Sequence, residues 1–268
     1  MESFTLKQLG QLVYYYCGLN YLNNIDSLET KITPRLQSLS LSLWEYMKFL
    51  DNNPNEWDQL VEILTINETY FFREDKQLTY FKDNILPKLK NRNSNKPIKI
   101  WSAACSTGEE PYSLAMLILD SGLIEPKKVQ IIGTDINKKV LTIAKNGTYS
   151  KRSLSFRRIP PEWLNKYFRE EEDAYKVKDS IKDMVDFHYV NLLDKEKMSM
   201  YHDFDIIFCR NVLIYFDQET IRKVASSFYQ SLVKGGYLFL GHAENISNMN
   251  IGFNTISTEG AFFYRKGE

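Results

Sequence analysis

Apolar side chains recur every three or four positions through the first quarter of the chain, without an alternating strand pattern. This spacing is typical of amphipathic helices that bury one face. Thr5 and Asn55 are candidate N-caps, and Ser42 with Glu45 has the spacing of a capping box, in which each side chain bonds the other residue's backbone N–H. The pattern predicts an all-helical N-terminal domain over residues 1–72.

The pattern changes in the next part of the chain. Residues 73–96 predict a linker, with a helix from about 75 to 90 and the polar loop KNRNSNKP. Residues 97–268 then hold short apolar runs, several of them separated by helical segments. Such alternation predicts a mostly parallel sheet that is buried on both faces, which defines an α/β fold. The runs are IKIWSAA, VQIIGTDI, VDFHYVNLL, FDIIFCRNVLIYF and GGYLFLGHAEN, the helical segments are about 110–121, 137–146 and 217–233, and GAFFYRK is the last strand.

One stretch departs from this alternation. Residues at about 165–187 are highly charged and contain no glycine, in the sequence FREEEDAYKVKDSIKDMVDF. They predict a small inserted subdomain, either a hairpin or a solvated excursion.

Composition limits the function classes. The 268 residues are 43% hydrophobic, and 34 basic residues balance 34 acidic ones, which argues against bulk nucleic-acid binding. The start, MESFTLKQLG, lacks the pattern of a signal peptide, and no apolar run approaches the ~18 residues of a membrane span. Three scattered cysteines fit a reducing compartment and offer no zinc spacing. We therefore expect a cytoplasmic protein without metal, nucleic acid or membrane insertion.

The segments after the predicted strands hold the candidate chemistry, because ligands of parallel sheets bind at the carboxyl ends of the strands. The turn WSAACSTGEEPYS contains a single glycine, Gly108, so it is poorly suited to a pyrophosphate. Glu109 and Glu110 open the following helix, where two carboxylates repel a phosphate and attract a cation. Asp135 ends the second strand, where an acid can accept hydrogen bonds from ribose hydroxyls. Together these residues indicate a cationic nucleoside such as S-adenosylmethionine.

Five motifs carry a resemblance to a known family. NETYFFRE, WSAACSTGEEPYSLAM, GTDIN, VNLL and FCRNVLIYFD occur in the order found in the CheR family, the chemotaxis protein-glutamate O-methyltransferases. The sequence resembles that family over nearly its whole length. The resemblance implies a Rossmann-like S-adenosylmethionine-dependent methyltransferase fold, with a mostly parallel sheet that ends in an antiparallel strand, preceded by a small helical domain. It also implies methylation of glutamate side chains of bacterial chemoreceptors in sensory adaptation, with S-adenosylhomocysteine as the product.

The resemblance further implies roles for individual residues. Glu110 would hold the amino-acid end of the cofactor, and Asp135 its ribose. Asn191 and Leu192 would line the adenine pocket. The residues expected to act on the acceptor carboxylate are Arg73, Arg210 and Tyr215. The full set expected to bind the cofactor is Asn67, Thr69, Arg73, Ala103, Glu110, Asp135, Asn191, Leu192, Arg210 and Asn211.

A glutamate carboxylate, with a pKa near ~4.3, is already nucleophilic at neutral pH, so the reaction needs no general base. Two alternatives remain open at this level. One is a cofactor-binding module that docks receptors without catalysis. The other is a nicotinamide-dependent Rossmann oxidoreductase, for which Asp135 fits and the glycine pattern does not.

Receptor docking is expected to run through the N-terminal domain. Lys31, Arg35 and Lys48 are the cations that could meet the acidic face of the cytoplasmic helical region of a chemoreceptor. Some members of the family tether a receptor tail peptide through the inserted subdomain, whose turn contains glycine. Here the turn falls on three acids, Glu171 to Asp173, which would accommodate it poorly and repel an acidic peptide. We therefore expect tail-peptide tethering to be absent.

Overall fold

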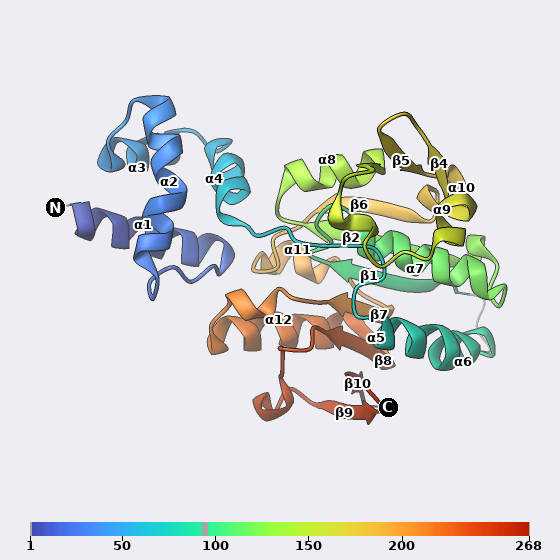
Figure 1. Ribbon diagram of the computed structural model, residues 1–268. Helices are drawn as coiled ribbons and strands as arrows, with labels where there is room; N and C mark the ends of the chain where they lie inside the picture. Colours follow the sequence, from blue (N-terminus) through green and yellow to red (C-terminus); the bar gives the residue numbers. More distant parts are fainter. Residues whose placement is uncertain (1, 93–95, 268) are drawn as a thin grey trace.

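Helices at the amino end pack around a hydrophobic cluster of their own. The computed structural model describes residues 2–92 and 96–267. Figure 1 shows the first helices, in blue, beside the sheet rather than on its faces. Leu9, Leu28 and Tyr46 are fully buried in their shared core. These helices are α1 (Glu2–Cys17), α2 (Ile25–Leu39), α3 (Leu43–Asn52) and α4 (Glu56–Leu64).

The predicted helix starts agree with the structure at two of three positions. The capping box of Ser42 and Glu45 is present at the start of α3. Thr5 lies inside α1, because that helix begins at Glu2. Asn55 is at the N-cap position of α4, as predicted, but its backbone is helical and its side chain makes no cap hydrogen bond. The N-cap prediction is therefore wrong for Thr5, and for Asn55 the position is confirmed without the bond.

A continuous helical segment connects the N-terminal helices to the sheet, close to the predicted 75–90. It consists of α5 (Asp75–Tyr80), a π-helical turn η1 (Phe81–Ile85) and α6 (Leu86–Lys90). Phe81 is fully buried, and its ring lies edge-on to Phe208 of the sheet, with 5.8 Å between ring centroids. Residues 93–95 of the predicted boundary loop lie outside the described residues.

The main sheet has the order β6-β2-β1-β7-β8-β10-β9, and its first five strands are parallel. β10 is antiparallel to both β8 and β9, so the predicted antiparallel end is present. β9 was not expected, since its side chains are only half-buried or exposed and give no apolar run. The strands are β1 (Ile98–Ala103), β2 (Val129–Asp135), β6 (Val185–Tyr189), β7 (Phe204–Cys209), β8 (Leu232–Leu240), β9 (Phe253–Thr258) and β10 (Ala261–Lys266).

Both faces of the sheet are covered, as the continuous apolar strands predict. In β7, Ile206 and Phe208 enter one hydrophobic cluster, while Ile207 and Cys209 enter another on the opposite face. The first cluster includes α7 (Glu109–Ser121) and part of α8 (Lys138–Asn146), and the second includes α12 (Gln218–Ser231). The shorter helical elements are η2 (Pro126–Lys128), α11 (Lys195–Ser199), η4 (Leu213–Tyr215) and η5 (Ser247–Met249). Among the described helices, none is long and apolar enough to cross a bilayer.

The inserted part forms a second sheet, with the order β3-β5-β4. The expected range of 165–187 begins too late, because β3 belongs to this sheet and is too short to show a strand pattern. At its other end the range overlaps β6. The β4–β5 hairpin closes with the Glu171 N–H donating to the Ala174 carbonyl at 2.9 Å, and no residue of the turn has positive φ. The acids therefore accommodate this turn, contrary to expectation. The elements are β3 (Thr148–Ser150), η3 (Leu154–Phe156), α9 (Pro161–Tyr167), β4 (Phe168–Glu170), β5 (Ala174–Val177) and α10 (Asp179–Lys182).

Candidate functional site

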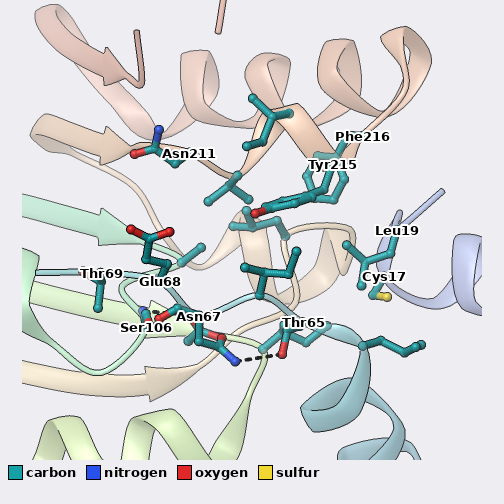
Figure 2. Close-up of a pocket in the computed structure, with 18 of the residues that line it drawn as sticks. Cys17, Leu19, Thr65, Asn67, Glu68, Thr69, Ser106, Asn211, Tyr215 and Phe216 are labelled. Carbon is teal, nitrogen blue, oxygen red and sulfur yellow. Dashed lines mark hydrogen bonds between the residues drawn. The ribbon is translucent and has the colours of Figure 1, made fainter. Parts of the chain in front are cut away.

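A cavity of about 370 Å³ lies where the carboxyl ends of β1, β2 and β7 meet the N-terminal helices. Figure 2 shows the segment after α4, with Asn67, Glu68 and Thr69, on one side of it and Tyr215 and Phe216 on the other. Ten of the eleven expected site residues line this cavity. The exception is Ala103, which is buried at the end of β1, while its neighbour Ala104 lines the cavity. The ten are Asn67, Thr69, Arg73, Glu110, Asp135, Asn191, Leu192, Arg210, Asn211 and Tyr215.

The turn after β1 bends sharply with only one glycine. Ala104 and Ser106 have positive φ values of 56° and 50°, and Gly108 has a φ of 94°. A Cβ at Gly108 would lie 2.9 Å from the Cβ of Ala144 in α8. Gly108 is thus required for left-handed backbone and for close packing of α8, and the turn is not a phosphate cradle.

Asp135 holds this turn in place. Its Oδ2 accepts a hydrogen bond from the Ser106 N–H at 2.9 Å, and its Oδ1 accepts one from the Asn137 N–H at 2.8 Å. Burial raises the pKa of Asp135 to about 6, and the backbone hydrogen bonds oppose that shift. The carboxylate is therefore ionised at neutral pH, and each oxygen keeps acceptor capacity for a ligand hydroxyl.

The two glutamates that open α7 have separate environments. Glu110 faces the cavity, and its carboxylate accepts hydrogen bonds from the Ser102 hydroxyl and from Nε of Arg210, both at 2.6 Å. Glu109 is 1% exposed and accepts hydrogen bonds from the hydroxyls of Thr107 and Ser155, at 2.6 and 2.7 Å. Burial raises the pKa of Glu109. Only Glu110 is placed to meet a cationic ligand.

Arg210 is a buried cation that is hydrogen-bonded to neighbouring segments of the protein. Its side chain is 2% exposed, and its guanidinium donates to the Arg73 carbonyl at 2.6 Å as well as to Glu110. A carboxylate oxygen of Glu74 lies 3.8 Å from the same guanidinium. With two carboxylates beside it, Arg210 has little charge left to attract an acceptor carboxylate, so its expected role in steering the acceptor is weakened.

Arg73, unlike Arg210, has no carboxylate of a described residue close to its guanidinium. Its guanidinium donates to the Glu68 carbonyl at 2.8 Å and lies 5.6 Å from the ring centroid of Tyr70. Among the described residues, no carboxylate oxygen lies within 4.0 Å of it. Tyr215 lines the same cavity, its hydroxyl group points inward in Figure 2, and burial raises its pKa. Arg73 is therefore better placed than Arg210 to meet an incoming anion.

Asn191 joins the N-terminal helices to the sheet. Its side-chain NH₂ donates to the carbonyl of Tyr16 at 2.6 Å, and its side-chain oxygen accepts from the Leu193 N–H at 3.0 Å. The Tyr16 carbonyl is in the last turn of α1, where carbonyls lack partners within the helix. The Asn191 amide group is thus committed to structure, and the ligand-facing surface here consists of the rest of Asn191 and of Leu192.

Sequence reasoning missed Glu244, which holds the lining residues Asn211 and Val212 in place. The carboxylate of Glu244 is buried and accepts hydrogen bonds from four backbone N–H groups, those of Gly241, Asn211, Val212 and Leu213, at 2.5–2.9 Å. Asn211 has a positive φ of 62°, so this loop is held in a bend that asparagine tolerates. The position of an acid after β8, in the sequence GHAEN, is a signal that could have pointed to Glu244.

The polar groups of the cavity wall fit a ligand that has hydrogen-bond donors and a positive charge. Asn211 Oδ1 is buried without a hydrogen-bond partner, and the carboxylates of Asp135 and Glu110 are acceptors. Ribose hydroxyls and an α-ammonium group are donors of the kind these atoms require. Among the described residues, no group of three or more His, Cys, Asp and Glu side chains is arranged to hold a metal ion.

A parallel sheet with an antiparallel end and a nucleoside-sized cavity at its carboxyl edge defines an S-adenosylmethionine-dependent methyltransferase class. Residues 67–262 match the family model described as "CheR methyltransferase, SAM binding domain". The chain belongs to the CheR methyltransferase family, which confirms the resemblance inferred from the motifs.

Two chemotaxis methyltransferases among the relatives agree with this membership. A "Chemotaxis protein methyltransferase" of Borreliella burgdorferi is 36% identical over 92% of this chain and 90% of that protein. One of Escherichia coli, with the same name, is 34% identical over 91% of this chain and 85% of that protein. A solved TehB-like methyltransferase from Corynebacterium glutamicum is 10% identical, with a TM-score of 0.39 over 73% of this chain and 98% of that chain.

Proposed function

We propose that this protein transfers a methyl group from S-adenosylmethionine to glutamate side chains of bacterial chemoreceptors, in the cytoplasm. The observation that carries the proposal is the arrangement of one cavity. Its acceptor atoms, on Asp135, Glu110 and Asn211, suit a cationic nucleoside, and Arg73 lies beside them without a carboxylate partner. The relatives named chemotaxis protein methyltransferases support the receptor as the substrate.

The bound cofactor would supply an electrophilic methyl group on a sulfonium. The chain's own residues would then position two opposite charges and exclude water. Arg73 would orient the acceptor carboxylate, Tyr215 would contact it, and Glu110 would hold the ammonium end of the cofactor. No general base is needed, because the acceptor glutamate is ionised at neutral pH.

A transfer assay tests the proposal. The full chain is incubated with methyl-labelled S-adenosylmethionine and a cytoplasmic chemoreceptor fragment, and the label is expected in the fragment as a base-labile ester. A fragment whose candidate glutamates are changed to glutamine is the matched control. Binding of S-adenosylhomocysteine without any transfer would favour the non-catalytic docking module instead. Equal labelling of both fragments would exclude glutamate as the acceptor.

We also propose that this protein does not tether a receptor tail peptide. The β4–β5 turn carries three exposed acids, Glu171 to Asp173, and no glycine. Such a turn repels an acidic peptide. In calorimetry, a peptide with the receptor's C-terminal sequence should show no heat of binding. Micromolar affinity would contradict this proposal.

Residues 1–72 are proposed to form a separate N-terminal domain, since their helices have their own hydrophobic cluster. The cations expected to dock the receptor there have other partners. Arg35 forms a two-point ion pair with Glu56, at 2.7 and 2.9 Å, and Lys31 lies 3.4 Å from the carbonyls of Ile63 and Leu64, in the cavity wall. Lys48 is exposed and lies 3.5 Å above the ring of Trp44. Docking through this domain would thus depend mainly on Lys48.

A further inference from the structure

Residues 151–158, with the sequence KRSLSFRR, form a segment between β3 and α9 that is called here the basic loop. Half of its residues are cationic. Lys151 pairs with Glu170 at 2.6 Å, and Arg157 pairs with Glu68 at 2.8 Å. Arg152 and Arg158 are exposed, and neither has an ion pair with any described residue. The basic loop therefore presents net positive charge to solvent.

The basic loop is fixed to the walls of the cavity. The Ser155 carbonyl accepts a hydrogen bond from the Phe71 N–H at 2.9 Å, and the Ser155 hydroxyl donates to Glu109 at 2.7 Å. The ring of Phe156 stacks on Phe71, with 5.5 Å between centroids. Phe71 belongs to the segment that carries Arg73, and Glu109 opens α7 directly after the turn that follows β1. The loop is thus held in one conformation by both sides of the site.

Arg157 links the loop to the mouth of the cavity. Its guanidinium lies 3.8 Å from the ring centroid of Tyr70, and the guanidinium of Arg73 lies 5.6 Å from the same ring. The partner of Arg157, Glu68, also lines the cavity. Arg73 and Arg157 therefore lie beside the same ring, and the exposed Arg158 follows Arg157 directly in the chain.

Helix α2 and the β4–β5 turn are less suitable surfaces for an acidic partner. On α2, the exposed positions include the acids Asp26 and Glu29, while the basic side chains of that helix have the partners described above. The β4–β5 turn is acidic as well. An anionic partner is thus repelled by both surfaces and attracted to the basic loop.

We propose that the basic loop is the surface that receives the acceptor, and that its occupant is an acidic helical segment of the receptor next to the methylated glutamate. This inference depends on the proposed function. Apolar side chains at the mouth suit the remaining face of such a helix, because Ile66 and Ile214 line the cavity and are 57% and 50% exposed. Leu154, in the loop itself, is 69% exposed. The charges steer and orient the segment, and Arg73 then meets the acceptor carboxylate.

The test is the double variant Arg152→Glu with Arg158→Glu. We expect the kcat/KM for a cytoplasmic receptor fragment to fall about tenfold or more at low salt, mainly through KM, and the difference to shrink at about 0.5 M salt. The affinity for S-adenosylhomocysteine should not change. The matched control is Lys127→Glu with Lys128→Glu, an equal change of charge in η2, at the amino end of β2 and away from the cavity.

The outcomes separate this inference from the proposed function. Absence of methyl transfer by the wild-type protein would remove the proposed function. If the wild type transfers methyl groups and the kcat/KM of the loop variant stays within twofold of the wild-type value, the inference alone is overturned. An equal loss of kcat/KM in the control variant would overturn it as well. A loss that disappears when the receptor fragment lacks its tail would assign the loop to the tail and would also overturn the inference. If the charge reversal prevents folding, Arg152→Gln with Arg158→Gln should give a smaller loss in the same direction, and no loss would refute it.

Discussion

Nε of Arg210 lies 2.6 Å from a carboxylate oxygen of Glu110, although 100 positions separate the two residues in the sequence. Arg210 follows β7, and Glu110 is in the first turn of α7, so the pair joins two segments of the cavity wall. Both side chains are largely buried, at 2% and 12% exposure. Removal of one member leaves a buried charge without compensation.

Arg210→Met should therefore lower the free energy of unfolding by about 3–5 kcal/mol. The double variant Arg210→Met with Glu110→Gln should lose less than the sum of the two single variants, because one of the two carboxylates left beside the missing guanidinium is gone, while Glu74 remains. Urea unfolding followed by circular dichroism measures all three. An Arg210→Met protein that unfolds at the wild-type urea concentration would show that the pair contributes little.

Asp135→Ala should weaken the binding of S-adenosylhomocysteine by about 2–3 kcal/mol, since two charge-assisted hydrogen bonds to the ribose would be lost. Isothermal calorimetry with the full chain measures the change. Asp194→Ala is a suitable control, because Asp194 caps the short helix α11 and does not line the cavity. Unchanged affinity in Asp135→Ala would remove Asp135 from the ribose site.

The pKa of Asp135, raised to about 6 by burial, predicts opposite effects of pH on cofactor affinity and on stability. Hydroxyl donors require the ionised carboxylate, so affinity should fall below pH 6 and be roughly tenfold weaker at pH 5 than at pH 7. In the cofactor-free protein, the folded state binds the proton more tightly than the unfolded state, in which the pKa is about 3.9. The stabilising contribution is then fully present below about pH 3.9 and is lost as pH rises through 6. Asp135→Asn should show neither dependence, and a pH-dependent affinity in that variant would assign the effect to another group.

Arg73→Ala should separate chemistry from cofactor binding. Because Arg73 has no carboxylate partner among the described residues, we expect it to orient the acceptor, and its loss should lower kcat about 10- to 100-fold. The affinity for S-adenosylhomocysteine should change by less than about threefold, because Arg73 is expected to act on the acceptor. Arg73→Lys, which keeps the charge, is expected to retain part of the rate. A variant with wild-type kcat and weakened cofactor binding would place Arg73 at the cofactor instead.

Strand patterns and strand ends were sufficient to predict the parallel sheet and the position of Asp135, because burial on both faces leaves long apolar runs. It was harder to predict which residue at a strand end faces the cavity. Ala103 is the buried last residue of β1, whereas Ala104 starts the turn with positive φ and lines the cavity, so an error of one position in the strand end exchanged the two. β3 and β9 were missed because one is three residues long and the other is largely exposed. Arg35 was expected to be a free surface cation, and no local signal shows that Glu56, 21 positions away, binds it.

The carboxylate of Glu244 is the main support of the loop from Asn211 to Leu213, whose residues lead into Tyr215. Four backbone N–H groups donate to it. A glutamine at this position would replace one carboxylate oxygen by an NH₂ group, which donates hydrogen bonds and cannot accept them. Glu244→Gln should therefore lower the free energy of unfolding by about 2–4 kcal/mol, since buried donors lose their partner. Glu259→Gln, at an exposed glutamate in the turn between β9 and β10, should stay within about 0.5 kcal/mol of wild type.

A positioning role of Glu244 also predicts a catalytic effect at temperatures where the variant is fully folded. There, Glu244→Gln should lower kcat more than it raises KM, because the loop and Tyr215 shift while the surface that meets the receptor is unchanged. Gly241→Ala disturbs the same loop while Glu244 itself is kept, because an added Cβ would crowd the Glu244 carboxylate at 2.9 Å and the Asn211 side chain at 2.8 Å. Both variants should show the same ratio of kcat to KM effects. Lower stability with a wild-type kcat in both would limit Glu244 to holding the fold.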